Sequence, residues 1–368
     1  MNRPASLVVR IAATAALAVG TLAATVPTQA TDKASVEPFA PIMVTVDTPN
    51  RGAKTRLQKL GLDLTEHAGH DYVEAVLHTP ADLLALTTSK LTYDVKIANM
   101  TERLIEIREI DEEFAATTAR SALPSGRTAY RTLDEYVEDM TTLAEENPKL
   151  VSMFDLNHVT LDGNTVHGVE IGAGPQAGKP TFLLMGLHHA REWPSGENAM
   201  EFAIDLVKNY GKDKRITRLM KKARVIVVPV VNPDGFDLSR TDGEVVDLRA
   251  LNDTGLDPLG GQTAILATPG QAYKRKNCRV IDGQDIPDGS CRATLASPGG
   301  FALGVDLNRN YGGFWGGPGA AGTTPNPAEV EVGPLDPTYR GPAPFSEPET
   351  QNIQELVRSR QVTMLISN

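Results

Sequence analysis

Two adjacent histidines and a glutamate follow an apolar run in the stretch LMGLHHAREWPSG, at residues 184–196. His189 and Glu192 offer an imidazole nitrogen and a carboxylate, which are ligand types that zinc prefers. His188 is a rival ligand, because a helical segment would place His188 and Glu192 on one face. A zinc site usually has three protein ligands. The stretch therefore predicts part of a metal site.

The surrounding pattern predicts where this site lies. The run PTFLLMGL is typical of a buried strand that ends at the histidines, and Ser195 is expected to cap the helix that follows. In open α/β sheets, ligands bind at the carboxyl ends of strands. The pair therefore stands where such a sheet places a binding site.

Further motifs follow in order along the chain: VVPVVNPDGF at 227–236, YKRKNCR at 273–279, GVDLNRNY at 304–311 and FSEPET at 345–350. Together with HAREW at 189–193, they resemble the zinc metallocarboxypeptidase family of the carboxypeptidase A and T type. The resemblance runs from about Tyr130 to the last residue. It implies one catalytic Zn²⁺ and peptide or protein C-termini as substrates.

The resemblance also implies residue roles. His189 and Glu192 would be zinc ligands, and Arg191 would contact substrate upstream of the scissile bond. Asn308 and Arg309 would hold the C-terminal carboxylate, for which a guanidinium offers a planar bidentate fork.

Two further roles depend on weaker matches. Arg275 would stabilise the developing oxyanion, although Cys278 shifts the alignment and leaves Lys274 and Arg279 as alternatives. Asp306 would accept a hydrogen bond from the second nitrogen of His189 and so fix its tautomer, or it is an ordinary loop residue.

The third zinc ligand is missing from this sequence. None of the seven histidines follows His189. In the family the third ligand is a histidine at the end of a later strand, which VTMLISN at 362–368 resembles on approach, and the general-base glutamate lies further on. We expect an incomplete copy that is inactive as it stands; the alternative is a complete but inactive protein.

Composition and the N-terminus limit the functional classes. The net charge of −10 argues against nucleic acid or an anionic membrane as a partner. Residues 1–30 predict a signal peptide, with an uncleaved anchor as the alternative. The mature protein is then secreted, without stable membrane association, and monomeric. Cys278 and Cys291 are a predicted disulfide, with two free thiols as the alternative.

Alternation of strands and helices predicts the domains. Residues 38–104 have the β-α-β-β-α-β order of a small α+β ferredoxin-like module. Residues 105–127 are a linker exposed to proteolytic nicking. Residues 128–368 are an α/β domain with a mixed, largely parallel sheet and helices on both faces.

The resemblance gives the module two readings. It is either a pro-domain that covers the active site and is cleaved off within the linker, or a permanent accessory domain. For the chain as a whole it implies a secreted zinc-dependent carboxypeptidase that hydrolyses the C-terminal peptide bond. The alternatives are a peptidoglycan-directed metallopeptidase of the same fold and a non-catalytic binding module with a decayed zinc site.

Overall fold

The computed structural model describes residues 39–241, 274–280, 303–313, 315–316 and 338–368. The predicted signal peptide and Cys291 lie outside these residues. The chain divides into the units Met1–Glu37 and Pro38–Asn368. No helix in the described part is long and apolar enough to span a bilayer.

The first part of the described chain is a four-stranded antiparallel sheet with the strand order β2-β3-β1-β4. Its elements are β1 (Ile42–Asp47), α1 (Arg51–Gln58), β2 (Asp63–Ala68), β3 (Tyr72–Leu77), α2 (Pro80–Thr88) and β4 (Tyr93–Ile97). Alternate residues such as Val44 and Val46 pack against Leu57 and Leu86 of the two helices. The element order is the one predicted from sequence, and the ferredoxin-like assignment stays a prediction.

A long helix, α3 (Met100–Thr117), leads to a segment without regular structure, and α4 (Leu133–Glu146) then begins the C-terminal part. Thr132 and Glu135 form a reciprocal capping box that satisfies two backbone N–H groups at the start of α4. This segment between α3 and α4 corresponds to the end of the predicted linker.

The C-terminal part is built on a five-stranded sheet with the strand order β5-β6-β8-β7-β9. The strands are β5 (Val151–Asp155), β6 (His167–Ile171), β7 (Thr181–Met185), β8 (Arg224–Val228) and β9 (Val362–Ser367). Strand β7 pairs in parallel with β8 and β9, whereas β6 pairs antiparallel with β5 and β8. The sheet is mixed as predicted, but parallel pairing does not predominate among the described strands.

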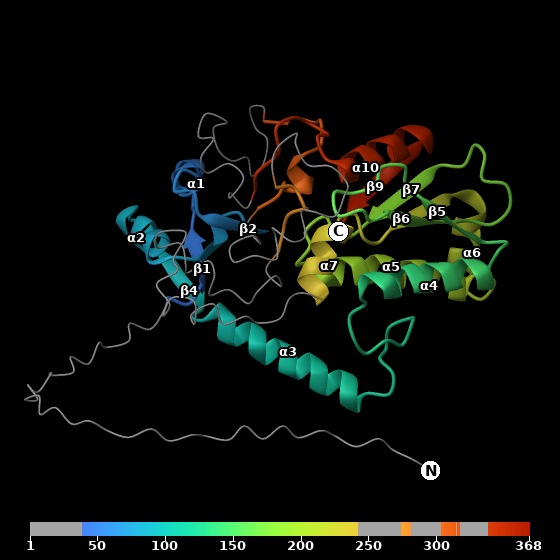
Figure 1. The fold of residues 1–368 in the computed structure, drawn as a ribbon, viewed down its shortest axis with the longest axis horizontal. Helices are drawn as coiled ribbons and strands as arrows, with labels where there is room; N and C mark the ends of the chain where they lie inside the picture. Colours follow the sequence, from blue (N-terminus) through green and yellow to red (C-terminus); the bar gives the residue numbers. More distant parts are fainter. Residues whose placement is uncertain (1–38, 242–273, 281–302, 314, 317–337) are drawn as a thin grey trace, which may run out of the picture. The chain divides into compact units, whose positions relative to one another are not determined.

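Helices cover both faces of this sheet (Figure 1). The helices are α5 (Trp193–Asn209), α6 (Lys214–Lys222) and α7 (Pro233–Thr241), with α4 on the same face, and α10 (Pro348–Ser359) on the other. Leu184 of β7 packs toward the face of α5, and its neighbours Leu183 and Met185 pack with Ile353 of α10. Because successive strand residues point to opposite faces and helices cover both, residues 182–185 of β7 are all apolar.

Candidate metal centre

The chain reaches the two histidines through a tight turn after β7. A Cβ on Gly186 would lie 2.7 Å from the backbone oxygens of Pro229 and Ser195, so a side chain there would collide with backbone. Leu187 adopts a φ of 51°, in the left-handed region that costs an ordinary residue energy. Its N–H donates to Ser195 Oγ at 2.9 Å and its carbonyl accepts from Asn232 N–H at 3.0 Å. These contacts hold the turn in place.

Ser195 therefore has a different role from the predicted helix cap. Helix α5 already begins at Trp193, and the residue before it, Glu192, makes no side-chain cap hydrogen bond. The hydroxyl of Ser195 accepts from the turn instead. Pro194 suits this early start, because proline is tolerated in the first turn of a helix.

His189 lies buried between two carboxylates. Its Nδ1 faces Glu192, 3.0 and 2.9 Å from Oε1 and Oε2, and its Nε2 lies 3.1 Å from Asp306 Oδ1. His189 and Asp306 are buried, whereas the Glu192 side chain is 40% exposed. The nitrogen of His189 that faces Glu192 is thus on the accessible side, and the other nitrogen faces the buried Asp306.

The electrostatics of this cluster favour its charged carboxylates. Burial raises the pKa of Asp306, but the charges of Arg275 and His189 lower it more, so that the pKa is well below its usual range. Burial also raises the pKa of Glu192, yet the hydrogen bond from His189 leaves it lowered. Burial lowers the pKa of His189, but Asp306 raises it above its ordinary value. Both carboxylates are therefore ionised at neutral pH.

Arg275 is the one of the three candidate cations that reaches this cluster. Its Nε and Nη2 donate to Asp306 Oδ2 at 3.1 and 2.9 Å, and its Nη1 lies 3.8 Å from Glu192 Oε1. Lys274 donates instead to the carbonyl of Leu303 at 2.5 Å. Arg279 forms an ion pair with Glu347 at 2.8 Å. These contacts favour Arg275 over Lys274 and Arg279, and its role toward the oxyanion stays a prediction.

Asn308 and Arg309 lie on a short 3-10 helix, η4 (Leu307–Arg309), whose N-cap is Asp306. One oxygen of Asp306 accepts from the backbone N–H of Asn308 at 3.0 Å, and that same oxygen faces His189. Asp306 thus connects the residues predicted to bind the substrate carboxylate, Asn308 and Arg309, to the predicted metal ligand His189.

Arg191 lies beside a carboxylate of the N-terminal sheet. Its Nη1 lies 4.0 Å from Oδ2 of Asp63, a buried residue of β2. Asp63 also lies 2.9 Å from Nε2 of His78. Burial raises the pKa of Asp63, but the His78 hydrogen bond and the Arg191 charge hold it well below its usual value. The predicted substrate contact is therefore paired with a carboxylate of the N-terminal sheet.

His188 is turned away from the metal cluster and is buried. Its Nε2 lies 2.7 Å from the hydroxyl of Tyr311, and its Nδ1 lies 3.1 Å from Ser367 Oγ at the end of β9. Burial and the neighbouring His189 lower its pKa to about 3, so it is neutral at pH 7. Both ring nitrogens are occupied by hydroxyl groups, which makes His188 a poor candidate for a ligand.

His189 and Glu192 offer donor atoms of types that suit zinc. An imidazole nitrogen and a carboxylate about 3 Å apart can share one ion, since zinc takes such donors at roughly 2.0–2.2 Å. The carboxylate on the second ring nitrogen is the partner that metal-bound histidines usually have. Within the described residues, no group of three or more His, Cys, Asp or Glu side chains could hold a metal. His189 and Glu192 therefore stay a predicted pair of zinc ligands.

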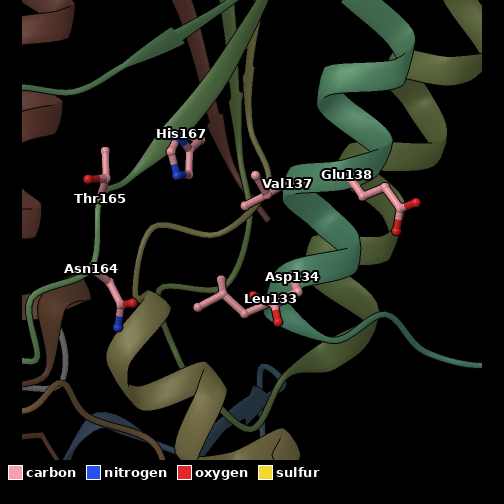
Figure 2. A pocket seen from close by; sticks show the side chains of 7 residues that line it. All are labelled: Leu133, Asp134, Val137, Glu138, Asn164, Thr165 and His167. Carbon is pink, nitrogen blue, oxygen red and sulfur yellow. The ribbon is translucent and has the colours of Figure 1, made fainter.

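A described pocket lies elsewhere in the fold. Figure 2 shows it beside α4, lined by Leu133, Asp134, Val137, Glu138, Asn164, Thr165 and His167. None of the predicted site residues lines it. In this pocket, Nδ1 of His167 lies 2.7 Å from Oδ1 of Asp155.

Three contributors to the site were missed in the sequence. Asn232 anchors the turn, with Nδ2 3.2 Å from the His188 carbonyl, and the NPDG motif carried a signal for it. Tyr311 and Ser367 showed no pattern that pointed to His188. Cys278 is disulfide-bonded, but its predicted partner Cys291 is outside the described residues, so the pairing stays a prediction.

The C-terminal part of the chain is similar in sequence to known proteins. Residues 136–368 match the model of the zinc carboxypeptidase (peptidase M14) family. Carboxypeptidase A2 of Mus musculus is 27% identical over 231 residues, covering 63% of this chain and 42% of that protein. Carboxypeptidase A1 of Rattus norvegicus is 27% identical over 271 residues, covering 73% and 51%. The chain therefore spans about half the length of these relatives.

Two solved structures have a fold similar to that of this chain. The carboxypeptidase A of Helicoverpa armigera has a TM-score of 0.62 at 20% identity, covering 90% of this chain and 70% of that one. Thrombin-activatable fibrinolysis inhibitor has a TM-score of 0.57 at 19% identity, covering 89% and 71%. The fold is thus carboxypeptidase-like. The chain belongs to the zinc carboxypeptidase family, a family of metallopeptidases that use a catalytic zinc.

Proposed function

We propose that this chain contributes active-site residues to a secreted zinc-dependent carboxypeptidase, which hydrolyses the C-terminal peptide bond of peptides or proteins. The observation that carries the proposal is His189 between Glu192 and Asp306, with η4 attached to the same aspartate. This arrangement joins a metal site to a segment with an arginine suited to carboxylates. A peptidase that reads a free C-terminus needs both.

The zinc would be held by His189 and Glu192, together with a ligand that is not among the described residues. Bound zinc supplies a Lewis acid and acidifies a water molecule. Asp306 keeps the Nε2 proton of His189 in place, so that Nδ1 presents its lone pair to the metal.

The other residues act on the substrate. Arg309 and Asn308 bind the terminal carboxylate and so select the last peptide bond. Arg275, fixed on Asp306 by two hydrogen bonds, presents its guanidinium edge toward Glu192 and stabilises the oxyanion of the scissile carbonyl. Arg191 contacts the substrate upstream of that bond.

The N-terminal module, residues 38–104, is proposed as a pro-domain that covers this site, joined by the linker 105–127 to the catalytic domain 128–368. The contact of Asp63 with Arg191 supports this reading, because a carboxylate of the module occupies an arginine assigned to substrate.

The carboxylate-reading role is tested by ligand binding, which does not require turnover. N-acetyl amino acids with a free carboxylate should bind the chain at least tenfold more tightly than the corresponding amides, measured by NMR titration. Arg309→Ala should remove this preference, because the bidentate pair is lost. Equal binding of acids and amides by the unaltered chain would refute the role.

A further inference from the structure

Six cations lie in and just before helix α6. The stretch KDKRITRLMKK at residues 212–222 holds them beside a single acidic residue, although the chain has a net charge of −10. All six side chains are exposed, and none makes an ion pair or a side-chain hydrogen bond within the described part of the chain. We call these residues the basic patch: Lys212, Lys214, Arg215, Arg218, Lys221 and Lys222.

The other side of α6 is fixed in the core. Ile216 and Met220 are buried in the apolar cluster that also contains residues of α4 and α5. Asp213 caps the helix, and its Oδ1 accepts from the backbone N–H groups of Arg215 and Ile216 at 2.7 and 2.9 Å. The helix leads into β8 at the end of the sheet opposite to the one that His189 follows (Figure 1). The basic patch therefore lies away from the candidate metal centre.

The charges of the basic patch disfavour the helix that carries them. Like charges three or four residues apart on a helix repel each other. Arg218 has four such neighbours, which are Lys214, Arg215, Lys221 and Lys222. The dipole of α6 favours cations in its last turn, but it disfavours them in its first turn, which contains no acidic residue. Natural proteins break such local rules mainly at functional sites, so the patch calls for an anionic partner.

The shape and composition of the basic patch indicate the kind of anion. Five of its six cations, all except Arg215, line a pocket of about 360 Å³ together with Gly211 and Thr217. Four of these five are lysines, which bind phosphate as point charges, whereas arginine is the residue suited to bidentate carboxylate pairing. No aromatic side chain is among the lining residues, so stacking of nucleic-acid bases is not supported there.

The length of the basic patch indicates more than one phosphate group. Lys214, Arg218 and Lys221 follow one side of the helix, and the first and last are about 10 Å apart along its axis at 1.5 Å per residue. A single phosphate cannot contact all three side chains at once. Several phosphate groups along one chain can.

We propose that the basic patch binds a linear polymer that carries phosphate in each repeating unit. The acidic remainder of the chain repels such a polymer, so that binding is confined to α6 and leaves the candidate metal centre free. This inference does not depend on zinc or on carboxypeptidase activity.

The test is binding of inorganic polyphosphate to the full chain, measured by calorimetry over a series of salt concentrations. The triple variant Lys214→Gln, Arg218→Gln, Lys221→Gln should bind at least tenfold more weakly at low salt. The slope of log affinity against log salt should fall by about three, one for each cation removed. Unchanged affinity and slope in this variant would overturn the proposal.

A charge-matched variant is the control. Arg56→Gln, Lys149→Gln and Arg358→Gln together remove the same charge from exposed positions outside α6, and this variant should bind like the parent. Equal losses in the two variants would show attraction by net charge alone and would refute the site. Orthophosphate bound as tightly as polyphosphate would contradict the polymer, and tighter binding of polyglutamate would contradict the choice of phosphate.

The single variant Arg218→Gln shows whether the cations serve the fold instead. Because it relieves repulsion from four neighbours, it should raise the urea concentration at the unfolding midpoint in low salt. The gain should disappear in high salt, where exposed charges are screened. A lower midpoint than that of the parent would mean that Arg218 stabilises the folded chain, and the argument for a ligand would fail.

Discussion

At the scale of residues, Asp306 connects the parts of the candidate site. It accepts from Arg275 with one oxygen, and its other oxygen faces His189 and accepts from the Asn308 N–H. The sequence indicated His189 and Glu192 from local spacing, but Asp306 lies 117 residues beyond His189. Only the resemblance placed Asp306 near His189, because composition and periodicity carry no information on contacts at that separation.

Replacing Asp306 tests this connection. Asp306→Asn should lower zinc affinity by about 10–100-fold, because the histidine loses the carboxylate that fixes its tautomer. Affinity is measured by competition with a chromogenic chelator. Asp155→Asn, at an aspartate with a side chain 69% exposed that pairs with His167, is the control and should leave zinc affinity unchanged. Equal affinity of the Asp306→Asn variant and the parent would show that Asp306 is only a loop residue.

At the scale of elements, the turn after β7 determines where both histidines point. The sequence predicted the strand and the following helix, because apolar runs and Gly/Pro punctuation are local signals. It misassigned Ser195, since a serine at the start of a helix has the same appearance whether it caps the helix or binds another turn. The backbone packing at Gly186 had no sequence signature of its own.

Gly186→Ala should destabilise the fold by about 1–3 kcal/mol, because the added Cβ would meet backbone atoms that cannot move aside. Gly313→Ala is the matched control: nothing lies within 4 Å of its added Cβ, and the change should stay within about 0.5 kcal/mol. Urea unfolding gives both values. A Gly186→Ala variant as stable as the control would mean that the turn is less closely packed than described.

The start of α4 gives a pH-dependent prediction. Burial raises the pKa of Glu135, but the Thr132 N–H and Arg127 lower it below 4.5. Its ionised form therefore stabilises the folded state fully above pH 4.5, and this contribution is lost as the pH falls through the lower folded pKa.

Glu135→Gln keeps an amide oxygen for the cap and removes the charge. The variant should be less stable than the parent by up to about 1 kcal/mol at pH 6. The difference should shrink as the pH falls from 5 toward 3, measured by urea unfolding at each pH. A difference that does not change with pH would exclude the ion pair as its cause.

At the scale of the whole molecule, charged contacts connect segments that are far apart in sequence. Arg191 lies 4.0 Å from Asp63. Glu197 of α5 and Arg240 of α7 hydrogen-bond the backbone of residues 130–131, at the start of the C-terminal part. The alternation of strands and helices predicted both sheets, yet it could not predict these pairings, because charged residues on a surface and charged residues in a buried pair look alike in sequence. Family membership rests on residues 136–368, which contain every predicted site residue.

The central claim is that His189 and Glu192 together bind zinc. The most direct measurement is zinc binding to the purified chain at pH 7 by chelator competition, for the parent, His189→Gln, Glu192→Gln and His188→Gln. We expect one zinc per chain, at least tenfold weaker binding in the first two variants, and parent-like binding in His188→Gln, because His188 faces Tyr311 and Ser367. Equal zinc binding by the parent, His189→Gln and Glu192→Gln would contradict the account.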